Sequence, residues 1–333
     1  MAASWFDDPH HDADRLLLLI DSFDEDLADL VGAGNGTWLE PFCSFFAPLA
    51  ARREISFRGR VCAMKPTIAS VVLLVVAFAM PAAAQLPPKN AAGISPGHIH
   101  LYVSDVAAQQ KFWETMGGVP VANQRLQMIQ IPGVFILLRG GQTKGGTVGS
   151  VVNHLGFAWK DLPAAKAKWQ AAGYTIEPGG DPNHGYILGP DGIRVEFSSD
   201  PSLQTPMKIT HVHLFGPDIP AMQAWYTKVL GGVAGTCSRQ SAPDGAACVE
   251  VAGVSVALSK SDTALEPTAG RSLDHIGFDV KNLPDFLARM AAEGVSITQG
   301  LTPSNFVSTM RVSFIADPWG TKMEITEGIA PQP

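Results

Sequence analysis

Four histidines stand at matching positions in four similar segments of this 333-residue chain. The segments read PGHIHLYV, VNHLGFAW, ITHVHLF and LDHIGFDV, and their shared histidines are His98, His154, His211 and His275. A single strand histidine is usually a packed or surface residue. Packing at such a position favours valine or isoleucine, so the recurrence in all four segments indicates a shared chemical role.

Two glutamates repeat in the same way. Glu196 and Glu324 each follow a Pro/Asp/Gly turn and stand at the same distance from its glycine, in an apolar strand-like run. A half-buried carboxylate without a partner is costly, so a cation is expected beside each one. A salt bridge on an edge strand is the alternative.

Together these residues supply two imidazoles and one carboxylate twice over. In chain order the predicted ligand sets are His98, His154 and Glu196, then His211, His275 and Glu324. Such a facial triad suits Fe(II), and also Mn(II), Co(II), Ni(II) or Zn(II), and leaves positions open for substrate, water or O₂. The sequence therefore predicts two divalent-metal sites, with Fe(II) favoured, that act on a small-molecule substrate.

Three further side chains are predicted to take part in catalysis. His100 and His213 lie two residues past a predicted ligand, on the same strand face. Neutral imidazole can act as acid or base near pH 7, although a buried histidine bonded to backbone is the alternative. Tyr186 is a candidate phenol for the first site, with core packing as its alternative. Gly156 and Gly277 occupy the same offset in the other two segments and are expected to leave room for a ligand.

The elements that must position these residues repeat as well. Each histidine-bearing strand is followed by a helical pattern and then by two or three short strands. Two helices share an aromatic pair and a Gly-Gly stop, and the other two open on Leu-Pro. The predicted short strands cover residues 126–131, 134–138, 186–188, 194–197, 247–251, 254–258, 312–315 and 322–325.

The two kinds of unit alternate, so the larger repeat is a pair of units. This pattern predicts two α+β domains, residues 94–200 and 207–328, joined by a polar linker that contains two prolines. Cys237 and Cys248 flank a Pro-Asp-Gly turn in the second domain. They could bridge two paired strands or remain free thiols, because the register cannot be derived from sequence.

Residues 1–63 differ from the rest in charge. They hold 11 acidic and 5 basic side chains, a net of −6, whereas the other 270 residues hold 20 and 19. Met64-Lys65, an apolar run over 68–80 and Ala82–Ala84 have the layout of a signal peptide with an Ala-x-Ala cleavage site. We therefore predict a signal peptide at 64–84 and a disordered, mis-extended reading frame at 1–63. The alternative is a cytoplasmic tail on a single-pass anchor.

These features set the expected class and location of the protein. A composition of 46% hydrophobic and 17% charged residues is typical of a globular protein. A pI near 5.7 argues against a nucleic-acid partner. Cleavage of the signal peptide implies export to the periplasm or the extracellular space, with no stable membrane insertion. The sequence is compatible with a homodimer.

Taken jointly, the four His-led strands, the Gly-Gly helix stops and the two turn–strand motifs resemble the vicinal oxygen chelate (VOC) superfamily over about residues 95–328. It groups glyoxalase I, extradiol dioxygenases, fosfomycin-modifying thiol transferases, methylmalonyl-CoA epimerase and bleomycin-binding proteins. The resemblance implies paired βαβββ modules that form cupped mixed sheets with outer helices around a metal. The resemblance also implies that both predicted sets match the three-ligand metal site of the family.

The sequence departs from three members of this superfamily. Glyoxalase I and the epimerase add a fourth ligand, but the matching strands 135–138 and 254–258 lack a carboxylate or amide. The dioxygenase signature has a His well before a Tyr, but Phe314 stands where that Tyr is expected. The resemblance implies a dioxygenase-type metalloenzyme first. The alternatives are a lyase, isomerase or thiol transferase with a non-redox metal, and a non-catalytic binding protein.

Overall fold

The computed structural model describes residues 86–177, 181–237 and 246–331, which form four copies of one strand–helix–strands module. The predicted signal peptide (64–84) and the extension (1–63) lie outside the described residues. Within the described part, no helix is long and apolar enough to cross a membrane.

Each module opens on a long strand, which one helix and three shorter strands follow. Module 1 consists of β1 (Ile94–Val103), α4 (Val106–Met116), β2 (Val119–Asn123), β3 (Leu126–Ile131) and β4 (Val134–Gly140). Module 2 consists of β5 (Val152–Trp159), α5 (Leu162–Ala171), β6 (Thr175–Glu177), β7 (His184–Leu188), a 3-10 turn (Pro190–Gly192) and β8 (Arg194–Ser199). The predicted short strands of this half are confirmed.

The second half of the chain repeats the same order. Module 3 consists of β9 (Met207–Gly216), α6 (Ile219–Leu230), β10 (Val233–Thr236), β11 (Ala247–Val251) and β12 (Val254–Lys260). Module 4 consists of β13 (Leu273–Val280), α7 (Leu283–Ala292), β14 (Ser296–Pro303), β15 (Arg311–Ala316) and β16 (Lys322–Glu327). The α+β class and the four βαβββ modules are therefore confirmed.

Local signals fix where the helices begin and end. Asp105, Asp161 and Asp218 each accept a hydrogen bond from the backbone N–H three residues on, which satisfies a donor that the first helical turn leaves unpaired. Gly117 ends α4 at φ 120°, and Gly231 ends α6 in the left-handed region at φ 58°. Both conformations favour glycine, so the predicted Gly-Gly stops hold.

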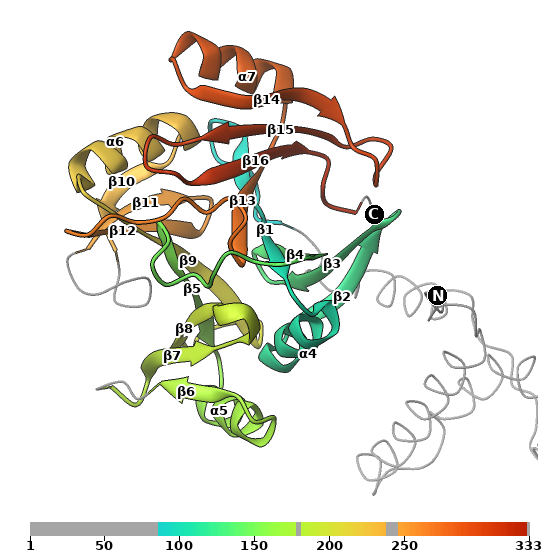
Figure 1. The fold of residues 1–333 in the computed structure, drawn as a ribbon, viewed down its shortest axis with the longest axis vertical. Coiled ribbons are helices and arrows are strands. Elements are labelled where there is room, and N and C mark those ends of the chain that lie inside the picture. Colours follow the sequence, from blue (N-terminus) through green and yellow to red (C-terminus); the bar gives the residue numbers. More distant parts are fainter. Residues whose placement is uncertain (1–85, 178–180, 238–245, 332–333) are drawn as a thin grey trace, which may run out of the picture. The chain divides into compact units, whose positions relative to one another are not determined.

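The modules pair first with fourth and second with third. One eight-stranded sheet runs β14-β15-β16-β13-β1-β4-β3-β2, and the other runs β10-β11-β12-β9-β5-β8-β7-β6. Their central pairs, β1–β13 and β5–β9, are antiparallel, and Figure 1 shows cyan β1 beside orange β13. This differs from the predicted division: residues 94–200 and 207–328 do not each build their own sheet, because each sheet takes half its strands from each segment.

The two faces of β1 have different roles. Ile99, Leu101 and Val103 are buried in the main hydrophobic core. Each such side chain contributes about 1.5–3 kcal/mol when fully buried. His98 and His100 alternate with them, so they point to the opposite, concave face of the sheet. The core thus anchors the strand that presents the site.

Cys237 and Cys248 form a disulfide bond, with Cα atoms 5.1 Å apart. Cys248 lies on β11 opposite Gly235 of β10, so the bond ties the chain just past β10 to its neighbouring strand. This settles the choice between bridged and free cysteines in favour of the bridge.

Candidate metal centres

The structure gathers histidines and glutamates into two clusters. The first centre consists of His98, His100, His275 and Glu324. The second centre consists of His154, Glu196, His211 and His213. Within each cluster, one ligand atom per residue lies within 4.8 Å of all the others. All six predicted ligands are therefore in a centre, together with the two histidines predicted for proton transfer.

Each centre takes its ligands from two modules that are not the two predicted from the chain order. His98 was expected beside His154 and Glu196, but it joins His275 and Glu324 instead. The reason is the sheet pairing: β1 pairs with β13, and β13 pairs with β16, which carries Glu324. By the same rule, β5 and β8 bring His154 and Glu196 to His211 on β9. The predicted sets in chain order are wrong, although their members are in the centres.

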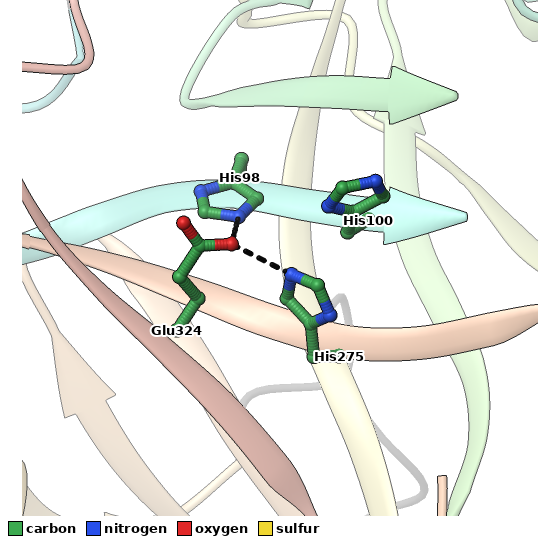
Figure 2. A group of neighbouring side chains, drawn as sticks. All are labelled: His98, His100, His275 and Glu324. Carbon is green, nitrogen blue, oxygen red and sulfur yellow. Dashed lines mark hydrogen bonds and ion pairs between the residues drawn. The ribbon is translucent and has the colours of Figure 1, made fainter. Parts of the chain in front are cut away.

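In the first centre, three atoms that could bind a metal lie close together. His98 Nε2 lies 3.2 Å and His275 Nε2 lies 2.8 Å from the same oxygen, Glu324 Oε2, as the dashed lines of Figure 2 show. The two histidines come from adjacent strands. His98 is 1% exposed, His275 4% and Glu324 9%. Two imidazole nitrogens and a carboxylate oxygen thus meet where the side chains are almost fully shielded from solvent.

The second centre repeats this arrangement. His154 Nε2 lies 2.7 Å and His211 Nε2 lies 3.7 Å from Glu196 Oε2. The two Nε2 atoms are 3.4 Å apart. His213 adds its Nδ1 at 3.1 Å from His154 Nε2. All four side chains are buried.

Gly277 and Gly156 serve a different purpose from the one expected. Each faces a histidine across an antiparallel ladder: Gly277 faces His98, and Gly156 faces His211. A Cβ added at either glycine would overlap the facing imidazole ring. The missing side chains therefore make room for the ligand histidines themselves, not for an external ligand.

His100 and His213 lie beside the ligand histidines. The His100 ring is 4.5 Å from that of His275, and the His213 ring is 4.6 Å from that of His154. Burial, reinforced by the neighbouring imidazoles, lowers the pKa of His100 to about 3 and that of His213 to about 2. Both side chains are therefore neutral near pH 7, and His213 Nε2 lies 2.8 Å from Ser259 Oγ.

Tyr186 belongs to the second centre. Its ring lies 5.2 Å from that of His154, and the Arg194 guanidinium stacks 3.6 Å from its centroid. Burial and the nearby Glu196 charge raise the pKa of Tyr186, so the phenol keeps its proton. The prediction grouped Tyr186 with His98, but the sheet pairing separates them. The corresponding residue of the first centre is Phe314, which faces Glu324 as Tyr186 faces Glu196.

His184 contacts the second centre, and the sequence did not single it out. Its Nε2 donates to Glu196 Oε1 at 2.9 Å, and this hydrogen bond raises the pKa of His184. The available signal was its position two residues before Tyr186 on the same strand face.

The residues fit a bound cation. Burial alone would raise the pKa of Glu324, but the His98 charge and the imidazole hydrogen bonds hold it well below its usual range. Among the described residues, His98 Nδ1, His100 Nδ1 and Glu196 Oε2 are buried without a well-formed hydrogen bond. A buried carboxylate oxygen that faces only imidazole nitrogens matches the nitrogen-and-oxygen donor set of a divalent transition metal.

Similarities to known proteins agree with this reading of the fold. Residues 208–325 match the family model of the Glyoxalase/Bleomycin resistance protein/Dioxygenase superfamily. Glyoxalase I from Zea mays shares 16% identity over 70% of this chain and 92% of its own, with a TM-score of 0.54. A candidate dioxygenase from Bacillus subtilis subsp. subtilis strain 168 shares 13% identity over 73% of this chain and 87% of its own, with a TM-score of 0.53.

No curated protein gives a significant match. The matched model covers the third and fourth modules, and the structural similarities extend the same fold over all four. Each sheet pairs two βαβββ modules around a cluster of histidines and a glutamate. Residues 208–325 therefore match the Glyoxalase/Bleomycin resistance protein/Dioxygenase superfamily, and the described chain shares the fold of glyoxalase I over all four modules.

Proposed function

We propose that this protein is an exported, divalent-metal-dependent enzyme that acts on a small oxygen-chelating substrate at two 2-His-1-Glu centres. One observation carries the proposal: His98 Nε2 and His275 Nε2 converge on a single buried oxygen of Glu324. His154 and His211 repeat the arrangement around Glu196. A buried set of this kind is the site that Fe(II) oxygenases use.

The residues around each centre suit proton transfer to and from a bound substrate. A bound metal would supply Lewis-acid polarisation of two vicinal substrate oxygens, and Fe(II) is the ion we favour. His100 and His213 are neutral near pH 7, so each can accept a hydrogen bond from a substrate hydroxyl, and transfer of the hydroxyl proton would be favoured if a bound metal acidified it. Tyr186 keeps its phenolic proton and can donate a hydrogen bond to a substrate oxygen at the second centre.

For the reaction, we favour a dioxygenase-type oxygenation. The support is that β4 and β12, which pair with β1 and β9, carry no carboxylate or amide that could serve as a fourth ligand. Phe135 and Leu137 of β4 stand opposite His98 and His100. In the second centre, Ser255 and Ala257 of β12 take these places. Neither pair offers the carboxylate or amide with which glyoxalase I completes its metal site.

A lyase, isomerase or thiol transferase with a non-redox metal is the second candidate. It is favoured by the placement of His100 and His213 within the donor clusters. If either histidine served as a fourth ligand, an octahedral ion would keep only two positions for a substrate. That number is enough to bind two vicinal oxygens, but it leaves none for O₂.

Metal analysis and turnover assays distinguish these functions. The purified protein is assayed for bound metals, for O₂ uptake on a panel of catechols, and for conversion of hemithioacetals and thiol transfer. Tight iron with O₂ uptake supports the first candidate. Nickel, zinc or manganese with hemithioacetal or thiol turnover supports the second. Absence of stoichiometric metal, with ligand binding intact in His154→Ala and His275→Ala, contradicts both and favours a binding protein.

We also propose that residues 64–84 direct export and are then removed. The Cys237–Cys248 disulfide supports this location, because structural disulfides persist in oxidising compartments. N-terminal sequencing of the secreted or periplasmic fraction tests the proposal. We expect a mature start near Gln85, whereas a retained Met1 contradicts it.

A further inference from the structure

We infer that the two metal centres are unequal, and that the first centre binds a divalent cation more tightly because Asp274 positions and polarises its ligand His275. This inference rests on the proposed function, since it assumes that both clusters are metal sites. The centres share their ligand types, so the difference must come from the side chains that contact the ligands.

Asp274 holds the ligand imidazole through a charged hydrogen bond. Its Oδ1 lies 2.5 Å from His275 Nδ1. An ionised carboxylate can only accept, so His275 Nδ1 carries a proton, and in the neutral ring the Nε2 lone pair would be left to bind a metal ion beside Glu324 Oε2. The Gly270 N–H donates to Asp274 Oδ2 at 2.6 Å, which fixes the carboxylate. Such a carboxylate–histidine pair orients a metal ligand and increases its basicity.

The corresponding residue of the second centre is an amide. Asn153 precedes His154 as Asp274 precedes His275, and its Oδ1 lies 2.9 Å from His154 Nδ1. This contact also orients the ring, but it brings no negative charge. Hydrogen bonds to an ionised group are roughly twice as strong as those between neutral groups, so His154 is the weaker donor of the two.

The glutamates differ in the same direction. Glu196 Oε1 accepts a hydrogen bond from His184, which draws electron density away from the carboxylate. His184 stands opposite Ser198 on the neighbouring strand, and the residue in the matching register of module 4 is the apolar Val312. In the described part of the chain, no imidazole takes the matching place beside Glu324, and Glu324 is therefore the stronger donor.

One contact of the second centre opposes this ranking, because the first centre has no counterpart to it among the described residues. Thr210 Oγ1 lies 3.0 Å from His211 Nδ1 and steadies that ligand, whereas His98 Nδ1 is without a partner among the described residues. A hydroxyl is neutral, so its contribution is smaller than that of the Asp274 carboxylate.

Cations near the ligands also enter the comparison. Lys322 Nζ lies 2.7 Å from Asp274 Oδ1 and offsets part of its charge. The matching cation, Arg194, pairs with Glu177 at 2.7 Å, and no contact joins Glu177 to a ligand histidine among the described residues. Each centre thus has one further carboxylate and one cation, but only in the first centre does that carboxylate touch a ligand.

A Co²⁺ titration of the metal-free, full-length protein tests the ranking by calorimetry and visible absorption. We expect two binding classes of one Co²⁺ each, of unequal affinity. Asp274→Asn should weaken the tight class by about 10–100-fold and alter the absorption of the first Co²⁺ bound. Asn153→Asp should tighten the weak class, a gain that a merely structural residue would not produce. Asp262→Asn, on a side chain that is 83% exposed, is the matched control.

Single-centre variants assign the classes. His154→Ala should retain the tight class, and His275→Ala should retain only the weak one. Equal affinities, a tight class that survives His275→Ala, or an Asp274→Asn effect no larger than that of the control would overturn the inference while the proposed function stands. If neither centre binds Co²⁺ or any other divalent ion, the proposed function fails with it.

Discussion

His98 and Gly277 face each other across the β1–β13 ladder, and the imidazole fills the space that any side chain at position 277 would occupy. His211 and Gly156 stand in the same relation across β5–β9. These glycines bear no ligand atom, yet each sets the position of a ligand ring. The two glycines are therefore required for the geometry of the centres, because any side chain there would displace a ligand ring.

Gly277→Ala should empty the first centre. The added methyl would overlap the His98 ring, so the ring must turn away and its Nε2 leaves Glu324. We expect the bound metal to fall to about half, with one centre remaining, while the protein stays folded and loses about 1–3 kcal/mol of stability. Metal analysis and a thermal melt measure both. Gly300→Ala is the control, because a Cβ there meets nothing within 4 Å. Full metal content in Gly277→Ala would contradict this geometry.

Double variants test the pairing of the modules. His98 and His275 share a centre, so replacing both with alanine should remove one metal and leave the other. His98 and His154 lie in different centres, so replacing both should remove all metal. If the ligand sets followed the chain order, His98 and His154 would share a centre, and replacing both would leave one metal bound. Metal per chain, measured after gel filtration of folded protein, decides between the two arrangements.

His100→Gln and His213→Gln should separate proton transfer from metal binding. If the two side chains act as bases, metal content stays unchanged while kcat falls by about 10²–10⁴-fold at the affected centre. Glutamine retains polarity and approximate size, which limits collapse of the site. Loss of metal in either variant would instead make that histidine a fourth ligand and favour the lyase or isomerase candidate.

Stability should fall at alkaline pH through Tyr226. Its Oη donates to Asp317 Oδ2 at 2.6 Å, and burial, followed by the Asp317 charge, raises the pKa of Tyr226 well above 10. The unfolded tyrosine ionises near pH 10, so this contribution is complete below about pH 10 and is lost as the pH rises toward the folded-state pKa.

Urea unfolding at about pH 8 and about pH 11 measures this effect. Tyr226→Phe should be less stable than wild type at the lower pH and should lose less stability between the two values. Tyr174→Phe is the control. It keeps the ring that packs edge-on against Phe112 and removes only the hydroxyl, so the loss of stability between the two pH values should match that of wild type. If Tyr226→Phe loses as much stability between the two pH values as wild type does, Tyr226 is not the source of the pH dependence.

The Cys237–Cys248 disulfide should stabilise the protein. It closes a loop of 11-residue separation, for which chain-entropy arguments give roughly 2–4 kcal/mol. The double variant Cys237→Ser/Cys248→Ser should lose that amount in urea unfolding, and a reductant should destabilise the wild type by a similar amount. The same reductant should not affect the double variant. A reductant effect of equal size on both proteins would rule out this bond as its cause.

The sequence alone determined the local parts of this protein. Strand alternation, polar helix caps and glycine stops depend on neighbours within a few residues, so β3 and β11 were predicted to the residue. The four matched histidines and two matched glutamates were identifiable because a ligand recurs at a fixed offset within each module. These signals also sufficed for the VOC resemblance.

Only the tertiary structure decided which ligands share a centre. The four first strands look alike in sequence, so any of them could have paired with any other. The pairing depends on contacts between strands that are far apart along the chain. His98 fits against Gly277, and His211 fits against Gly156. Within module 2, the pairing of β7 with β8 brings His184 to Glu196 and thereby makes two centres with equal ligands chemically different.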